Sequence, residues 1–242
     1  FTIKPKAVTV IPDASQSKEY GESDPMFTYT VNPSLVGDDV FSGSLSRESG
    51  EDAGAYPFTI GTLNAGSNYV VSLADDNFTI SPKLITVTPD VKSKEYGESD
   101  PTFTYTVNLP LAGSDAINGT LSREEGEDVG SYVITIGTLS AGGNYTITLS
   151  PADFTIKPKA VTVIPDASQS KVYGEIDPTL TYTVYPSLLG DDSFSGTLSR
   201  ELGEDAGIYS FTIGSLSAGD NYSITLSDAD FAITKKSVTI TP

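Results

Sequence analysis

The densest group of side chains able to do chemistry is the segment RExGED, which occurs three times. It places Arg47, Glu48, Glu51 and Asp52 within six residues, and the same four types recur at 123–128 and 200–205. Two carboxylates suffice for glycoside hydrolysis when one is an acid of raised pKa in a cleft. A repeat of about 76 residues offers little room for such a cleft. We therefore interpret the segment as an exposed hairpin loop in which Arg47 pairs with a local carboxylate, and expect no catalytic residues.

A second group consists of aspartates in predicted turns, which are candidate calcium ligands because hard oxygen ligands suit calcium. No D-x-[DN]-x-[DN]-G loop accompanies them, and turn aspartates equally well accept backbone hydrogen bonds. We expect no obligatory cofactor and keep calcium as the one candidate metal. The candidate ligands are Asp38, Asp39, Asp75, Asp76, Asp153, Asp191 and Asp192.

Two further constellations each have a structural alternative. A lysine buried beside an Asn or Asp and a carboxylate can form an isopeptide bond, which the lysines near predicted strands permit: Lys18, Lys94 and Lys171. The tyrosines of the FTYTV and LTYTV segments can form a platform for sugars if they face solvent: Tyr29, Tyr105 and Tyr182. The chain has no tryptophan, and aromatic residues alternating at strand spacing typically pack the core, which is the interpretation we favour.

Composition excludes most enzyme classes. The chain of 242 residues contains no cysteine and no histidine, which removes thiol nucleophiles, Ser-His-Asp triads and the common zinc, copper and haem ligand sets. Its 14 basic and 32 acidic residues leave a formal charge of −18, so phosphate backbones and anionic membrane surfaces repel it. No apolar stretch approaches the roughly 18–20 residues that span a bilayer. We expect a non-enzymatic protein that neither binds nucleic acid nor inserts into a membrane.

The elements that must position these residues belong to an internal repeat. A Tyr-Gly step stands at 20–21, 96–97 and 173–174, and each is followed by an Asp-Pro step, an FTYTV-like segment, the RExGED segment and a turn of the form LxAGxNY. Residues 1–18 are identical to residues 154–171. Because self-similarity at a fixed period indicates a repeat architecture, we expect the chain to be a slice of a longer array.

Alternation of apolar and polar residues predicts strands throughout each repeat, separated by Gly, Asn, Asp and Pro clusters. The segment PSLVGDDVF at 33–41 and its equivalents are the one place where a short helical turn is expected. We predict a mostly β chain of three tandem small domains. The favoured domain is a grasp-like mixed sheet with that helical turn, and the alternative is an immunoglobulin-like sandwich.

The repeat boundaries follow from where the pattern restarts. Residues 1–5 form the tail of a preceding repeat, 6–81, 82–157 and 158–234 form repeats 1, 2 and 3, and 235–242 start a following one. Only a Pro-Lys step joins neighbouring repeats, at Pro5-Lys6, Pro82-Lys83 and Pro158-Lys159. Because proline between extended segments resists bending, whereas a Gly/Ser linker is flexible, we expect an elongated, semi-rigid rod.

In order and spacing, the opening ITVTPD-like strand, SKxYGExDP, FTYTV, SGxLSRExGEDxGxY, TIGTLSAGxNYxITL and the closing DFTI strand resemble the bacterial MBG repeat of the YGX type. The resemblance covers all three repeats and both partial ends. It implies a tandem-repeat segment of a large exported surface protein or adhesin, with no catalytic or ligand residues to carry over. Repeat 2 departs modestly, because Ser114 and Asp115 stand where the other repeats have two aspartates.

The resemblance and the composition together favour a structural function. We expect an extracellular spacer or stalk on a bacterial cell surface, monomeric, whose partners are the neighbouring repeats of the same chain, while other regions of the parent protein contact a host or environmental surface. Strong negative charge keeps such an array soluble and extended. The alternative is a module that binds glycan or protein weakly and gains strength by multivalency.

Overall fold

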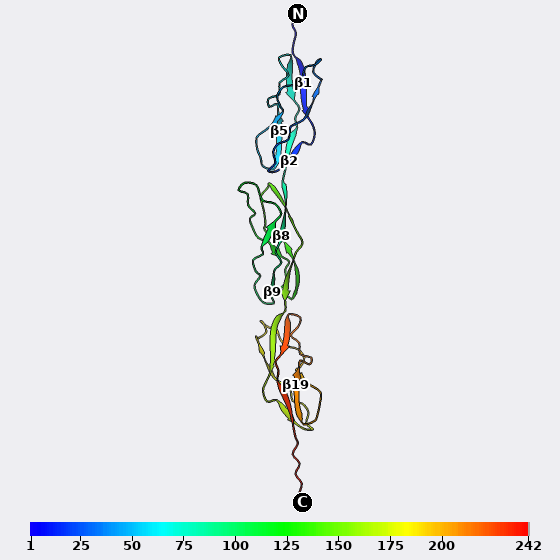
Figure 1. The fold of residues 1–242 in the computed structure, drawn as a ribbon, viewed down its shortest axis with the longest axis vertical. Coiled ribbons are helices and arrows are strands. Elements are labelled where there is room, and N and C mark those ends of the chain that lie inside the picture. The colour runs from blue at the N-terminus through cyan, green and yellow to red at the C-terminus, as the bar shows by residue number, and fades with distance from the viewer. Residues whose placement is uncertain (242) are drawn as a thin grey trace. The chain divides into compact units, whose positions relative to one another are not determined.

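The computed structural model describes residues 1–241, and these residues form strands joined by turns (Figure 1). There are 21 strands, seven in each repeat, and no helix among the described residues. No helix long and apolar enough to cross a membrane occurs in this part of the chain. The predicted mostly β class with three tandem small domains is confirmed.

Repeat 1 contains two small mixed sheets. In the first, β1 is the central strand, antiparallel to β3 and parallel to β6. In the second, β7 lies parallel to β2 and antiparallel to β5, which in turn pairs with β4. The strands are β1 (Lys6–Pro12), β2 (Ser17–Glu19), β3 (Tyr29–Asn32), β4 (Ser46–Arg47), β5 (Gly54–Thr59), β6 (Tyr69–Leu73) and β7 (Asn77–Ser81). The chain therefore changes sheet five times. Two of these crossings, β1–β2 and β6–β7, run side by side, because β1 pairs with β6 and β2 pairs with β7.

Both sheets contribute to one core. Alternation in β1 turns Val8 and Val10 inward, and both are at most 1% exposed. Val10 packs in one cluster with Phe58 of β5 and with Phe78 and Ile80 of β7. Because the two sheets share this cluster, neither sheet can shift in register without exposing apolar residues.

Two details of the predicted domain need correction. The segment 33–41 forms a turn in which the Asp39 N–H donates to the Val36 carbonyl at 3.2 Å, and it is not helical. Gly37 lies within that turn at a φ of +59°, which a continuing helix does not accommodate. The sheets are mixed, as expected, but each complete repeat has a pair of them, in place of the single grasp-like sheet with a helical turn that we favoured.

The seven-strand pattern recurs in the rest of the chain. Repeat 2 contains β8 (Lys83–Pro89), β9 (Ser93–Glu95), β10 (Tyr105–Val107), β11 (Ser122–Arg123), β12 (Gly130–Thr135), β13 (Tyr145–Leu149) and β14 (Asp153–Lys157). Repeat 3 contains β15 (Lys159–Pro165), β16 (Ser170–Val172), β17 (Tyr182–Tyr185), β18 (Ser199–Arg200), β19 (Gly207–Thr212), β20 (Tyr222–Leu226) and β21 (Asp230–Thr234). The sheet orders match those of repeat 1 strand for strand.

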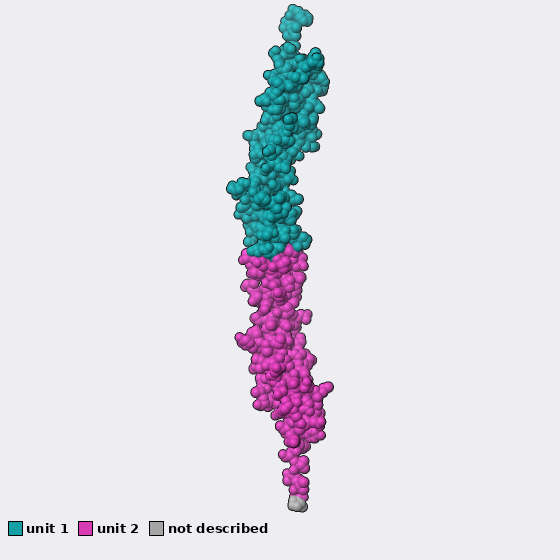
Figure 2. All heavy atoms as spheres, viewed as in Figure 1, with its two compact units in different colours: residues 1–90, 104–122, 135–151 teal, residues 91–103, 123–134, 152–242 magenta. Residues whose placement is uncertain are grey.

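The chain divides into two compact units, and the division falls inside repeat 2 (Figure 2). Unit 1 comprises 1–90, 104–122 and 135–151, which is repeat 1 with the sheet β10-β8-β13. Unit 2 comprises 91–103, 123–134 and 152–242, which is repeat 3 with most of the sheet β11-β12-β14-β9. Each junction between successive repeats therefore lies within one unit.

Truncating the Phe78 side chain to alanine is expected to destabilise repeat 1 strongly. Phe78 is 0% exposed at the centre of the shared core, and a phenylalanine-to-alanine change at such a position costs about 3–5 kcal/mol. Urea denaturation followed by circular dichroism measures the loss. The matched control is Val70→Ala, at a position that is 58% exposed, where a change within about 0.5 kcal/mol is expected. Equal effects of the two substitutions would contradict the described core.

Candidate functional site: the joint between repeats

Each repeat contains a cluster of two buried cations and two carboxylates. In repeat 1, Lys18 of β2 places its Nζ 2.7 Å from Oδ1 of Asp24 and 2.5 Å from Oε2 of Glu51. The side chains of Lys18 and Arg47 are only 3% and 5% exposed, whereas the Glu51 side chain is 69% exposed. The cations therefore point inward and their carboxylates face solvent.

Arg47 of β4 uses its whole guanidinium group. Its Nε and Nη2 donate to the two oxygens of Asp24 at 2.7 and 2.9 Å, and Nη2 also donates to Glu51 at 2.8 Å. Its Nη1 donates to the carbonyls of Glu48 and Gly50. Such fork-like bonding combines electrostatic strength with a fixed geometry that lysine cannot copy.

The Arg47 guanidinium also lies over two aromatic rings, 4.9 Å from the centre of Tyr56 and 5.4 Å from that of Phe78. This cation–π contact connects the ionic cluster to the apolar core. A side chain at Gly50, whose φ is +152°, would overlap the Tyr56 ring. The glycine of RExGED is therefore required by the close approach of that ring.

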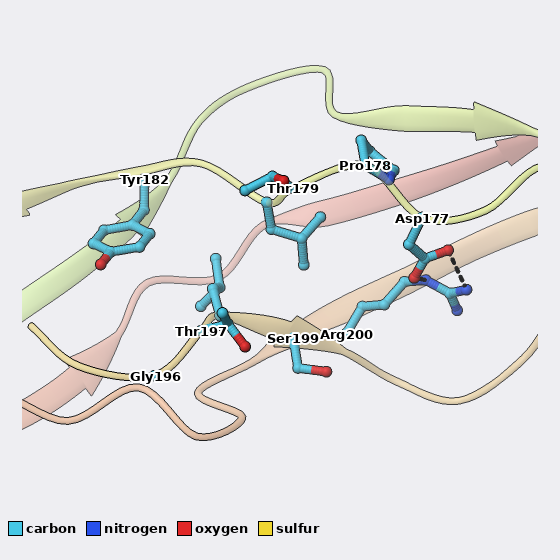
Figure 3. A pocket seen from close by; sticks show the side chains of 10 residues that line it. Asp177, Pro178, Thr179, Tyr182, Gly196, Thr197, Ser199 and Arg200 are labelled. Atoms are coloured by element: carbon cyan, nitrogen blue, oxygen red, sulfur yellow. Dashed lines mark hydrogen bonds and ion pairs between the residues drawn. The ribbon is translucent and has the colours of Figure 1, made fainter.

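The cluster recurs in all three repeats with the same partners. Its other members are Lys94, Asp100, Arg123 and Glu127 in repeat 2, and Lys171, Asp177, Arg200 and Glu204 in repeat 3. In repeat 3 the Asp177–Arg200 pair borders an open groove of about 420 Å³ (Figure 3). Leu180 lines that groove at the position where repeat 1 has Phe27, which packs edge-on against Phe58 and Phe78.

The cluster holds all four groups in their charged forms. The hydrogen bond from Arg47, and then the one from Lys18, lowers the pKa of Asp24 although burial opposes the shift. The hydrogen bond from Lys18, with a further one from Arg47, lowers the pKa of Glu51. Burial alone would lower the pKa of Lys18, but its bonds to the two carboxylates outweigh burial and raise it.

This charge state argues against both reactions that the residue types of the cluster would allow, glycoside hydrolysis and isopeptide formation. Glycoside hydrolysis requires a carboxylic acid of raised pKa, whereas Asp24 and Glu51 are shifted in the opposite direction. Isopeptide formation requires a neutral amine, and here the Lys18 amine forms ion pairs with both carboxylates. The predicted pairing of Arg47 with a local carboxylate is present as Arg47–Glu51, but Arg47 is buried and not in an exposed loop.

The joint between repeats 1 and 2 is built from residues next to this cluster. The Tyr20 hydroxyl donates to Oδ2 of Asp115 at 2.8 Å, and Tyr145 donates to the same oxygen at 2.9 Å. The two tyrosine rings meet edge to face with their centres 5.3 Å apart. Asp115 thus accepts one hydrogen bond from each repeat and connects them.

Asn144 forms the second half of this joint. Its Nδ2 donates to Oδ1 of Asp52 at 2.9 Å, and its Oδ1 accepts the Ala53 N–H at 2.7 Å. Its backbone carbonyl accepts the N–H of Lys83, the first residue of β8. The Asn144 amide therefore bonds the loop after RExGED of repeat 1, and its backbone holds the strand that enters repeat 2.

The joint between repeats 2 and 3 repeats these contacts within unit 2. Tyr96 donates to Asp192 at 3.1 Å, Tyr222 donates to the same oxygen at 2.6 Å, and the two rings lie 5.5 Å apart. Asn221 donates to Asp128 at 2.8 Å and accepts the Val129 N–H at 2.8 Å. Each joint is therefore built from four recurring features of the sequence. They are the Tyr-Gly step, the last aspartate of RExGED, the Asn-Tyr pair of the LxAGxNY turn, and the second acidic position of the Gly-Asp-Asp segment within the turn at 33–41 and its equivalents.

The structure places the calcium candidates in turns or at the start of a strand, where several of them accept hydrogen bonds. Asp39 and Asp192 accept tyrosine hydroxyls, Asp76 accepts the neighbouring Asn77 N–H, and Asp153 pairs in β14. The remaining candidates, Asp38, Asp75 and Asp191, are exposed. Among residues 1–241, no three acidic side chains are grouped so as to hold a metal ion. Asp115 keeps the tyrosine contact although residue 114 is serine, because only the second acidic position takes part.

The candidate sugar platform is half-buried. Tyr29 packs on the core of repeat 1, edge-on to Phe41, and Tyr182 packs in the same way beside Phe194 in repeat 3. Tyr105 is also half-buried. These contacts agree with the core interpretation of the FTYTV segment.

Lowering the pH is expected to weaken each repeat through the cluster. The pKa values of Asp24 and Glu51 are lowered from ordinary values of 3.8 and 4.5, so their stabilisation is present above those values and is lost as the pH falls through the folded-state pKa values. The free energy of unfolding, measured in urea from pH 7 to pH 2, should fall below about pH 4. Glu51→Gln should lower stability at pH 7 and flatten the acid dependence, and an unaltered dependence would contradict the assignment.

Replacing Asn221 by alanine is expected to open one joint and leave the other intact. The substitution removes the acceptor of the Val129 N–H, so hydrogen exchange at that amide should accelerate by about tenfold if a bond of about 1.4 kcal/mol is lost. The Ala53 N–H, held by Asn144 in the other joint, is the internal control and should exchange at the wild-type rate. Unchanged exchange at Val129 would show that Asn221 does not hold the joint in solution.

Comparison with known proteins agrees with the repeat pattern. A family model described as MBG domain (YGX type) matches residues 8–79, 85–155 and 161–232. No curated protein matches the chain. Our own boundaries at 6–81, 82–157 and 158–234 remain predictions. The three matches cover most of the chain, and the residues of the joints and clusters fall within them or at their edges, so this protein belongs to the MBG domain family of the YGX type.

Proposed function

We propose that this chain is a spacer segment of a bacterial cell-surface adhesin, in which MBG repeats are held in series and carry an adhesive region away from the cell. The observation that supports this most is the recurrence of one joint. Both junctions use the same tyrosine–aspartate and asparagine–aspartate bonds between the same positions. Polar contacts that recur at both junctions are suited to holding each repeat in a defined orientation relative to the next.

The joint strengthens the link that the Pro-Lys step provides. The step alone limits rotation at one residue, whereas the hydrogen bonds fix the faces of two repeats against each other. A neutral hydrogen bond contributes about 0.5–1.5 kcal/mol and one to a charged group about 1.5–3. The few bonds of a joint therefore add resistance to bending between the two repeats.

The surface chemistry fits an exported spacer. The six cations of the clusters are paired with six carboxylates, so the net charge of −18 resides on the rest of the chain. Such a charge favours solubility and separation of neighbouring chains. A spacer function requires no cofactor and no catalytic centre, because the length of the array determines how far the adhesive region lies from the cell.

Small-angle scattering of the whole chain tests this function. The double variant Tyr20→Phe, Asn144→Ala loosens the first joint, and we expect a broader distribution of dimensions than for the wild type. Tyr29→Phe is the matched control, because it removes a hydroxyl within one repeat. Scattering of the double variant that superimposes on the wild type would contradict the role of the joint.

The same experiment with calcium and then with a chelator addresses the metal. A spacer stiffened by its proline steps and hydrogen-bonded joints should give an extended profile that chelation leaves unchanged. Collapse or bending on chelation would instead assign the stiffness to calcium at the junction aspartates. Binding of the chain to a glycan array would favour the alternative function, a multivalent binding module.

A further inference from the structure

Two segments of repeat 1 run side by side in the same direction. The entering leg, residues 6–20, contains β1 and β2, and the leaving leg, residues 68–81, contains β6 and β7. β1 pairs in parallel with β6, and β2 pairs in parallel with β7. Within the repeat, β1 and β2 lie toward opposite ends (Figure 1). The chain therefore enters the repeat at the start of one leg and leaves it at the end of the other.

Backbone hydrogen bonds join the two legs from one end to the other. At the start of the legs the Lys6 N–H donates to the Asn68 carbonyl at 2.8 Å, and at their end the Tyr20 N–H donates to the Ser81 carbonyl at 2.9 Å. Besides the parallel ladders, two more bonds lie between these ends, from the Ala74 N–H to the Val10 carbonyl at 2.8 Å and from the Thr79 N–H to the Gln16 carbonyl at 3.2 Å.

Serine side chains of the leaving leg add further bonds to the entering leg. The Ser72 Oγ lies 3.0 Å from the Thr9 Oγ1 and donates to the Val8 carbonyl at 3.3 Å. The Ser81 Oγ donates to the Lys18 carbonyl at 3.1 Å. Each of these hydroxyls therefore links one leg to the other, and neither bond lies within a single leg.

Repeat 3 has the same pair of legs, residues 159–173 and 221–234, with β15 parallel to β20 and β16 parallel to β21. Threonine stands where repeat 1 has Ser72 and Ser81, and its hydroxyl makes the equivalent bond in both places. The bonds at the ends and the two side-chain bonds are Lys159 N–H to Asn221 carbonyl at 3.0 Å, Tyr173 N–H to Thr234 carbonyl at 2.8 Å, Thr225 Oγ1 to Val161 carbonyl at 3.2 Å and Thr234 Oγ1 to Lys171 carbonyl at 3.1 Å.

We propose that these repeats bear tension along the chain, and that the paired legs are the element that resists it. A pull on the two ends of a repeat draws the entering leg one way and the leaving leg the other way. The legs can separate only by sliding, which stretches all the bonds between them together. If the same legs were peeled apart from one end, the bonds would break one after another and each would carry the whole load in turn.

The core adds to the resistance against sliding. Val10 of the entering leg shares one buried cluster with Phe78 and Ile80 of the leaving leg. A slip of one residue turns every side chain of a strand to the opposite face. Sliding therefore breaks hydrogen bonds and removes apolar side chains from the core in the same step.

Tension also has a direct path from one repeat to the next. β7 ends at Ser81 and β8 begins at Lys83, so only Pro82 separates the leaving leg of repeat 1 from the first strand of repeat 2. This load-bearing role goes beyond the proposed spacer function, because a spacer needs length and orientation but not strength. It rests on bonds within a repeat and makes no use of the joints.

Pulling repeat 1 in two directions with optical tweezers tests the proposal in the whole chain. The chain has no cysteine, so handles attach only at cysteines that are introduced. Ala7→Cys with Thr79→Cys loads the legs in the sliding direction, whereas Ala7→Cys with Val70→Cys peels them, because Ala7 and Val70 are partners in the register of β1 and β6. All three positions are exposed.

At the same constant force, we expect repeat 1 to unfold at least about tenfold more slowly in the sliding direction than in the peeling direction, since the unfolding rate governs forced unfolding. Equal rates in the two directions would overturn the proposal.

A pair of serine variants locates the resistance within the repeat. In the chain with cysteines at 7 and 79, Ser72→Ala removes hydroxyl bonds between the legs and should speed unfolding under tension about tenfold. Ser42→Ala is the matched control, because the exposed Ser42 hydroxyl donates to the Asn64 carbonyl outside both legs. Its unfolding rate should stay close to that of the parent chain, and an equal acceleration by both variants would contradict the role of the legs.

Small-angle scattering of the wild type separates this proposal from the spacer function. An extended profile together with equal rates in the two pulling directions would remove the load-bearing role and leave the spacer. Slow unfolding in the sliding direction together with a compact, bent profile would leave the load-bearing role and remove the spacer.

Discussion

The stability of each repeat depends on ion pairs between two buried cations and two carboxylates, because a small core cannot hold an unpaired charge. Lys18 and Arg47 are almost fully enclosed, and Asp24 and Glu51 reach them from the solvent side. Removing one partner of a buried ion pair typically costs about 3–5 kcal/mol, although the exposure of Glu51 to water reduces that figure here. A repeat of about 76 residues with no disulfide has few other means of fixing its long loops.

The same cluster positions the joint. Lys18 and Asp24 bracket the Tyr-Gly step, so their ion pair holds the loop from which Tyr20 extends. Arg47 and Glu51 hold the loop that ends in Asp52, which bonds Asn144 of the next repeat. The ionic network within a repeat and the hydrogen bonds between repeats are therefore parts of one continuous arrangement. This explains why RExGED and the Tyr-Gly step recur together.

Local features were predictable from the sequence, and long-range partners were not. Alternation identified the strands and placed Tyr29 and Tyr182 on the core. Successive side chains of a strand point to opposite faces, so a short stretch of sequence is enough to assign the inward face. Lys18 and Glu51 are 33 residues apart, and Tyr20 and Asp115 are 95 apart, so no local pattern connects them. The sequence does mark the joint residues in another way, because each of them recurs at the equivalent position of successive repeats. The helical turn was wrong because Gly37 at positive φ closes a tight turn.

The chemistry of the joint determines the conditions under which it holds. Its donors are tyrosine hydroxyls, asparagine amides and backbone N–H groups, and only its acceptors include charged groups. Such bonds are less sensitive to salt than surface ion pairs, which screening weakens. The bond to Asp115 raises the pKa of Tyr20 above 10.0, so this contribution is complete below pH 10 and is lost only as the pH rises through the raised value. The tyrosine donors of the joints therefore keep their protons throughout the acidic range in which Asp24 and Glu51 become protonated, and they lose them only at alkaline pH.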